Sequence, residues 1–199
     1  MGKETERKLE VGDLQLLDCI LCDREVRGCM ERDFSYVQME TTYFDTPEHT
    51  LSKSRRMLRL RRENEKSVVC IKTAGDGVSR GEWELEGEYL EDTVPLLVKQ
   101  GAPAEIQALL ESEALSPVCG ARFTRITAPL ATDGCRFAIC GDIGELFGGT
   151  KKLPLCELEL ELKEGSAEPM LAFGRMLMER YRLSEEPKSK VARAMALRI

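Results

Sequence analysis

The chain has 199 residues, a formal net charge of −6, and a composition of 42% hydrophobic and 32% charged residues. These values are typical of a globular domain, and no apolar run approaches the roughly 18 residues that a membrane span requires. The acidic balance argues against nucleic acid as a partner, since general affinity for it depends on a basic field. The charged amino terminus lacks the apolar core of a secretory signal, so we expect a cytoplasmic protein without a membrane partner.

Eight cysteines are present, but they do not predict a zinc site. Cys19 and Cys22 form a C-x-x-C motif within an apolar pattern at helical spacing, so we expect them to be small core residues. A zinc site would need further ligands, and His49 is the only histidine. Reduced, mostly buried thiols agree with an intracellular protein.

The first part of the chain is expected to alternate strands with helices. Gly28 is the expected stop of the first helix, while Thr46 and Pro47 are expected to cap and begin the second. The patterns predict strands over residues 3–11, 34–45, 57–63, 67–73 and 82–86, a tight turn over 64–66, and helices over 13–26, 46–54 and 92–115, the last broken near 101–103.

The remaining part of the chain repeats this alternation. Strands are predicted over residues 118–128, 136–143 and 155–162, and helices over 168–181 and 187–196. No composition shift or linker divides the chain, so we expect one domain over residues 1–199.

One predicted strand, residues 155–162, has glutamate at every second position from Glu157 to Glu161. Successive side chains of a strand point to opposite faces, so Glu157, Glu159 and Glu161 are expected on one face and the leucines on the other. Like charges at this spacing are costly unless cations lie opposite them. The strand therefore predicts facing cations, from the protein or from a metal.

Similar charged columns recur on several other strands. Alternating charge on one strand usually marks a solvated face of an antiparallel sheet, but several long helices here also need an apolar sheet surface to pack on. We therefore predict an α+β fold whose eight or nine mainly antiparallel strands curl into a closed β-barrel, with a charged lumen and helices outside. The acidic columns are Glu4/Glu6, Glu82/Glu84/Glu86 and Glu157/Glu159/Glu161, and the basic residues are Lys8, Arg59, Arg61, Lys72 and Arg125.

The chemistry of such a lumen follows from its residue types. Arginine and lysine without histidine or an aromatic platform suit a small, highly charged anion, of which phosphate is the obvious example. Glutamates at two-residue spacing suit a hard cation such as Mg²⁺ or Mn²⁺, whose shell water and phosphate oxygens complete. Together these groups predict metal-assisted phosphoryl transfer to water, with the basic residues stabilising the leaving polyphosphate.

The motifs of the chain resemble those of the CYTH family, the triphosphate tunnel metalloenzymes. Glu4, Glu6 and Lys8 match the ExExK signature of that family. The match continues in the family's order over residues 43–47, 58–62, 71–72, 82–84, 123–125, 142–144, 156–162 and 189–190. The resemblance implies an eight-stranded antiparallel tunnel that hydrolyses a triphosphate. Family members include inorganic, thiamine and RNA triphosphatases and class IV adenylyl cyclases.

The resemblance also implies roles for individual residues, although a salt-bridged lumen residue is the alternative in every case. The catalytic set would be Glu4, Glu6, Lys8 and Glu161, and the metal carboxylates would be Glu4, Glu6, Glu159 and Glu161. The residues that hold the triphosphate would be Lys8, Arg59, Arg61, Lys72 and Arg125, with Lys190 and Arg122 at one end. Glu84, Asp142 and Glu157 would support them, Glu84 by orienting a lysine or arginine.

Two departures from the family pattern bear on substrate choice. Bacterial relatives carry an acid four residues before the aspartate that matches Asp142, whereas this chain has Ala138. Many of them also continue into a helical, histidine-rich domain, whereas this sequence ends at Ile199, so we expect a stand-alone CYTH domain.

Three functions are consistent with the sequence. The leading expectation is metal-dependent hydrolysis of inorganic triphosphate or a compact organic triphosphate. A class IV-type adenylyl cyclase and a non-catalytic module that binds polyphosphate or nucleotide are the alternatives. The expected partner is a small polyphosphate or nucleotide. A homodimer, the preferred metal and the physiological substrate are left open.

Overall fold

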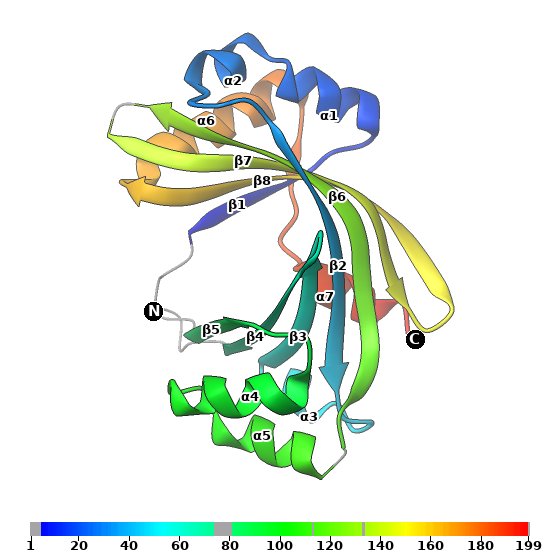
Figure 1. Cartoon of the computed structure of the whole chain (residues 1–199). Coiled ribbons are helices and arrows are strands. Elements are labelled where there is room, and N and C mark those ends of the chain that lie inside the picture. Colours follow the sequence, from blue (N-terminus) through cyan, green and yellow to red (C-terminus); the bar gives the residue numbers. More distant parts are fainter. Residues whose placement is uncertain (1–4, 74–80, 113, 133, 199) are drawn as a thin grey trace.

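The computed structural model describes residues 5–73, 81–112, 114–132 and 134–198. These form one antiparallel sheet of nine strands in the order β5-β4-β3-β2-β6-β7-β8-β1-β9 (Figure 1). The strands are β1 (Glu6–Glu10), β2 (Ser35–Asp45), β3 (Arg56–Glu63), β4 (Lys66–Thr73), β5 (Gly81–Glu86), β6 (Ser116–Thr132), β7 (Cys135–Gly148), β8 (Lys151–Gly165) and β9 (Ser184–Glu185). The α+β class and the antiparallel pairing are therefore confirmed.

The sheet bends into two arms, and helices cover the outer surface of each (Figure 1). One arm carries α1 (Leu14–Leu21), α2 (Arg24–Cys29) and α6 (Ala167–Tyr181), and the other carries α3 (Thr50–Lys53), α4 (Leu90–Lys99) and α5 (Ala104–Glu111). The last helix, α7 (Lys190–Ala196), packs instead on the concave surface against β6 and β7. The concave side is thus bounded by both arms and by α7.

The alternation in β8 separates an apolar face from a charged one, as expected. Leu158 and Leu160 are fully buried in a core that they share with α1 and α6. Glu159 lies on the concave face, where it lines a cavity. Burying a leucine side chain contributes about 1.5–3 kcal/mol, so the helices fix which face of the strand can remain charged.

Two further apolar clusters hold the other parts of the sheet. Leu58, Val69 and Ile71 are fully buried beneath α4 and α5. On the concave face, Ala194 of α7 belongs to a cluster with Tyr43 and other residues of β2, β6, β7 and β8. This second cluster anchors α7 at one end of the curve.

The expected closed barrel of eight strands differs from the observed sheet. The two-residue strand β9 adds a ninth member, and it pairs with β1. Within the described ranges, β5 pairs only with β4 and β9 only with β1, so hydrogen bonds do not join the two edges. Charged side chains and α7 occupy the space between the arms.

Two helices have different boundaries in the structure from those expected from the sequence. The helix expected over residues 13–26 is divided into α1 and α2, because Asp23 accepts a hydrogen bond from the Glu25 backbone N–H at 2.7 Å and starts a new helix. The next helix begins at Thr50 rather than Pro47. The Thr46 hydroxyl caps it by accepting from the Thr50 backbone N–H at 3.0 Å, while a carboxylate oxygen of Asp45 accepts from Leu51 at 2.8 Å.

The cysteines are all free, and four of them are buried. Cys19 and Cys22 are exposed, so their assignment to the core was wrong. The buried positions of α1 are Leu17, Ile20 and Leu21, which leave the two cysteines on the outer side of the helix. In the described parts of the chain, no helix has the length and apolar character needed to cross a membrane.

Candidate functional site

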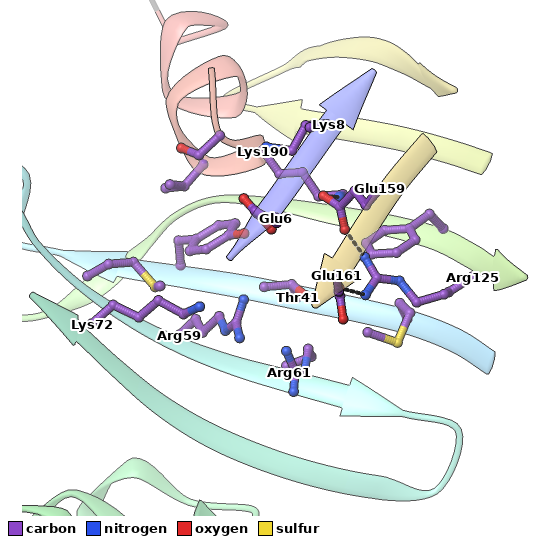
Figure 2. A pocket seen from close by; sticks show the side chains of 16 residues that line it. Glu6, Lys8, Thr41, Arg59, Arg61, Lys72, Arg125, Glu159, Glu161 and Lys190 are labelled. Atoms are coloured by element: carbon purple, nitrogen blue, oxygen red, sulfur yellow. Dashed lines mark hydrogen bonds and ion pairs between the residues drawn. The ribbon is translucent and has the colours of Figure 1, made fainter. Parts of the chain in front are cut away.

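A cavity of about 180 Å³ lies on the concave side of the sheet (Figure 2). Side chains from both arms and from the first turn of α7 line it. Nine of the residues expected at the site meet here, namely Glu6, Lys8, Arg59, Arg61, Lys72, Arg125, Glu159, Glu161 and Lys190. Glu4 lies outside the described residues.

The pairing of β1 with β8 places opposite and like charges side by side. Glu6 is directly opposite Glu161, and Lys8 is opposite Glu159. Cβ atoms of residues facing each other on antiparallel strands are about 4.5–5.5 Å apart, so the first pair brings two carboxylates together. Such a pair is destabilising unless a cation lies between or beside the two groups.

Arg125 on β6 connects three acidic residues of β7 and β8. Its guanidinium binds Asp142 with two donors, at 2.8 and 2.7 Å, and reaches Glu159 at 2.5 Å and Glu161 at 3.1 Å. A guanidinium carries five N–H donors in a fixed plane, so these four contacts hold the carboxylates in defined orientations.

Lys190, at the start of α7, completes the same network from the opposite side. Its ammonium contacts Asp142 at 2.7 Å, Glu159 at 2.8 Å and also Glu157. Burial alone would raise the pKa of Glu159, but Lys190 and Arg125 outweigh it and hold that pKa at about 2. The pair of Glu159 and Lys190 at the α7 end of the cavity therefore stays charged at neutral pH.

Glu157 lies behind this network rather than in the cavity lining. It contacts Lys190 and Arg193, and burial raises its pKa in spite of both cations. Among the described residues, oxygens of Asp142, Glu157 and Glu159 lie within 4.8 Å of one another. Since Lys190 contacts all three, the protein already neutralises much of this cluster.

The other arm contributes cations that are paired with glutamates. Arg59 reaches Glu84 at 3.0 Å, and Lys72 reaches Glu82 at 2.7 Å. Arg61 contacts Glu63 at 2.6 Å and also lies 3.6 Å from Glu84. The expectation that Glu84 orients basic residues agrees with these distances.

The structure does not bring Arg122 to the cavity. Its side chain is 62% exposed and pairs with Glu40 at 2.5 Å. Arg122 and Arg125 are three positions apart on β6, so the alternation of the strand directs them to opposite faces. Ala138, which stands in place of an acid, is paired in register with Glu161.

Two residues that sequence reasoning did not assign to the site support it. Arg193 binds Glu157, and its position one turn after Lys190 on α7 could have indicated this. The Phe123 ring lies 5.2 Å from the Lys190 ammonium and 5.8 Å from the Arg125 guanidinium, distances at which cations are attracted to an aromatic face. Phe123 lies two positions before Arg125 on β6, and this spacing could have indicated that its ring is on the same face of the strand.

The donor set can accommodate a hard divalent cation. Glu6, Glu159 and Glu161 supply carboxylate oxygens from two adjacent strands to one cavity, and carboxylates are the ligands that Mg²⁺ and Mn²⁺ prefer. The repulsion between Glu6 and Glu161 would fall on binding such an ion. The residues present therefore fit the metal that the fold family implies.

Comparisons with known proteins agree with this geometry. An inorganic triphosphatase of Haemophilus influenzae is 29% identical over 138 residues, which are 66% of this chain and 38% of that protein. The match thus spans little more than a third of that relative.

Solved structures show the same fold at low sequence identity. A candidate adenylyl cyclase from Hippeastrum, described as having a dominant triphosphatase activity, has a TM-score of 0.66 and 16% identity, with 99% of this chain and 97% of that chain covered. A candidate adenylate cyclase from Bacillus halodurans has a TM-score of 0.58 and 18% identity, with 96% of each chain covered. Residues 2–195 match the CYTH domain. The chain therefore belongs to the CYTH family, the triphosphate tunnel metalloenzymes.

Proposed function

We propose that this protein hydrolyses inorganic triphosphate or a similarly compact organic triphosphate with the help of a divalent cation. The observation that carries the proposal is one cavity lined by carboxylates from β1 and β8 and by cations from β3 and β4. The two curved arms would be the walls of the triphosphate tunnel, with α7 at one end. The match to an inorganic triphosphatase supports the same reaction class.

Lys8, Arg59, Arg61 and Lys72 are the proposed principal phosphate ligands. They come from β1, β3 and β4 and line the same cavity. Arginine binds phosphate oxygens through paired N–H donors, and lysine binds as a point charge. A bound polyphosphate would exchange with the glutamates that now neutralise Arg59, Arg61 and Lys72.

Arg125 and Lys190 would contact the triphosphate from the other side, but most of their donors already bind carboxylates. Asp142 is fully buried and receives both cations, so it fixes their positions. We assign these two residues chiefly to orienting Glu159 and Glu161, which is a narrower role than the phosphate contact expected from the family resemblance.

Glu6, Glu159 and Glu161, together with Glu4, would hold Mg²⁺ or Mn²⁺. When bound, such an ion supplies Lewis-acid polarisation of phosphate oxygens and makes a coordinated water more acidic. The arginines and Lys72 would stabilise negative charge on the departing pyrophosphate, because preorganised donors need little rearrangement as charge develops. Attack of water at the terminal phosphorus releases orthophosphate together with pyrophosphate from inorganic triphosphate, or with the organic diphosphate from an organic triphosphate.

Metal-free protein incubated with tripolyphosphate, ATP or thiamine triphosphate, with Mg²⁺ or Mn²⁺ added back, tests the proposal. We expect release of orthophosphate that depends on the added metal. Cyclic AMP with pyrophosphate would instead identify a cyclase, and tight binding without turnover would identify a binding module. The variant Glu161→Gln removes one of the proposed metal ligands. Glu164→Gln is its matched control, since Glu164 is on the same strand but exposed.

A further inference from the structure

Both carboxylate oxygens of Glu161 are bound by protein cations. Oε1 accepts from Arg125 at 3.1 Å, and Oε2 accepts from the Lys163 ammonium at 2.8 Å. Lys163 follows Glu161 by two positions on β8, at the point where the pairing with β7 shifts register between Leu162 and Glu164, and both residues line the same opening. A divalent cation that uses Glu161 must therefore compete with one of these two contacts.

The two contacts differ in how easily they can be released. The Arg125 side chain is 19% exposed, and its guanidinium is also fixed by two hydrogen bonds to the fully buried Asp142. The Lys163 side chain is 56% exposed. A lysine ammonium is strongly hydrated and sits on a flexible stem, so it returns easily to solvent, and exposed ion pairs contribute only a little free energy. Lys163 is therefore the contact that can yield.

The surroundings of Glu161 favour replacement of that ammonium by a divalent ion. Glu6 is the direct partner of Glu161 on β1. A divalent ion between the strands carries two positive charges and can face both carboxylates at once, whereas the ammonium on Glu161 carries one. From β7, the partner of Glu161 is Ala138, whose methyl group offers neither a donor nor an acceptor.

We propose that Lys163 competes with a divalent cation for the Oε2 oxygen of Glu161, and that it thereby sets the metal concentration that the enzyme requires. The released ammonium stays at the opening that Lys163 lines together with Arg61 and Thr127. The inference rests on the proposed function in one respect, namely that the protein is an enzyme. The exchange of the ammonium for a metal ion is a binding event and does not require turnover.

Binding of Mn²⁺ without substrate, measured by isothermal titration calorimetry, tests the exchange directly. Lys163→Gln is expected to tighten Mn²⁺ binding by about 2- to 5-fold, the range that an exposed ion pair supports. Lys152→Gln is the matched control, because Lys152 is exposed on the same strand and pairs with Glu145 at 2.8 Å, away from the cavity. The control should leave the affinity unchanged.

Two outcomes would overturn the proposal. One is an unchanged or weaker affinity in Lys163→Gln. The other is an equal gain in both lysine variants, which would show a general effect of net charge.

A second measurement reports on the contact in the unaltered protein. The nitrogen-15 resonance of the Lys163 ammonium, assigned by its loss in Lys163→Gln, should shift during titration with Mg²⁺ and should not shift in Glu161→Gln. An unresponsive resonance in the unaltered protein would contradict the exchange.

These binding tests separate the inference from the proposed hydrolysis. An affinity gain without turnover of any triphosphate would retain the exchange and reject the reaction. Turnover of a triphosphate without an affinity gain in Lys163→Gln would retain the proposed reaction and reject the exchange.

Discussion

Glu157, Glu159 and Glu161 alternate regularly along one face of β8, yet the protein neutralises them to different extents. Glu157 is 1% exposed and contacts Lys190 and Arg193, and Glu159 is 5% exposed between Lys190 and Arg125. The outermost glutamate, Glu161, has one partly buried partner, Arg125, and one exposed partner, Lys163. Capacity to accept an external cation therefore increases from Glu157 to Glu161.

This gradient predicts unequal effects of removing single charges. Glu161→Gln is expected to lower kcat at saturating triphosphate by about 100-fold or more, because it removes a proposed metal ligand. Glu157→Gln is expected to cost less than about 5-fold, since Glu157 does not line the cavity. Steady-state phosphate release with Mg²⁺, and thermal unfolding of each variant, check the prediction. Equal losses in two folded variants would contradict it.

Glu159 should also contribute to the dependence of stability on pH. Its folded-state pKa is lowered from 4.5 to about 2, so the folded protein binds its proton less readily than the unfolded chain does. The contribution is complete above the unfolded pKa and is lost as pH falls from about 5 towards 2. Urea unfolding at pH 6, 5 and 4 should show the wild-type protein losing more stability than Glu159→Gln. Parallel pH profiles would exclude this role.

At the scale of elements, β6 and β7 require close backbone approach at a glycine. A Cβ atom on Gly144 would lie 2.2 Å from the Arg122 carbonyl oxygen and 2.5 Å from the Phe123 Cα. Both atoms belong to the backbone, so they cannot move without disturbing the pairing that positions Arg125. The sequence contains this glycine within a family motif, but only the packing explains it.

Gly144→Ala is therefore expected to reduce the free energy of unfolding by about 2–4 kcal/mol. Gly141→Ala on the same strand is the control, because the three atoms nearest to its Cβ would be side-chain atoms of Leu17, at 3.1–3.4 Å, rather than backbone atoms. The control should cost no more than about 1 kcal/mol. Urea denaturation monitored by circular dichroism measures both values. A larger loss in the control would refute the backbone argument.

The long strands extend further than their side-chain patterns indicated. Residues 155–162 were predicted from alternating glutamate and leucine, whereas β8 runs from Lys151 to Gly165. Its first residues pair with the end of β7, for example Leu153 with Leu146. Backbone hydrogen bonds continue the ladder wherever a partner strand is present, so alternation marks only the portion of a strand with two chemically different faces.

For the whole molecule, charged residues of the site are paired with one another within the protein. Glutamates hold Arg59, Arg61 and Lys72 on one arm, while Arg125 and Lys163 hold Glu161 on the other. Binding of an anion alone or a cation alone would leave part of this network unpaired. Metal and triphosphate together should replace both sets of contacts.

We therefore expect cooperative stabilisation by the two ligands. Mn²⁺ together with a non-hydrolysable triphosphate should raise the midpoint of thermal unfolding by more than the sum of the shifts that each ligand produces alone. For scale, a single ligand at a hundred times its Kd stabilises the folded protein by about 2.7 kcal/mol. Differential scanning calorimetry at constant ionic strength measures the shifts, and Glu164→Gln should behave as wild type. Simply additive shifts would contradict cooperative exchange.

The sequence by itself determined which side chains could face the cavity. Alternation assigned Glu159 and Leu160 to opposite faces of β8. Arg122 lies an odd number of positions from Arg125, which was sufficient to exclude it from the cavity face, although the family resemblance implied a phosphate contact. This information is local, because the direction of a strand side chain follows from its own backbone.

Only the tertiary structure decided which charges meet and where the sheet ends. The contact of Lys190 with Asp142 joins α7 to β7, and the edges at β5 and β9 remain separate within the described residues. The partner of each charge, including Arg125 on Glu161, depends on strand order, on curvature and on the packing of α7. These features arise from contacts between residues far apart in the chain, which no local pattern encodes.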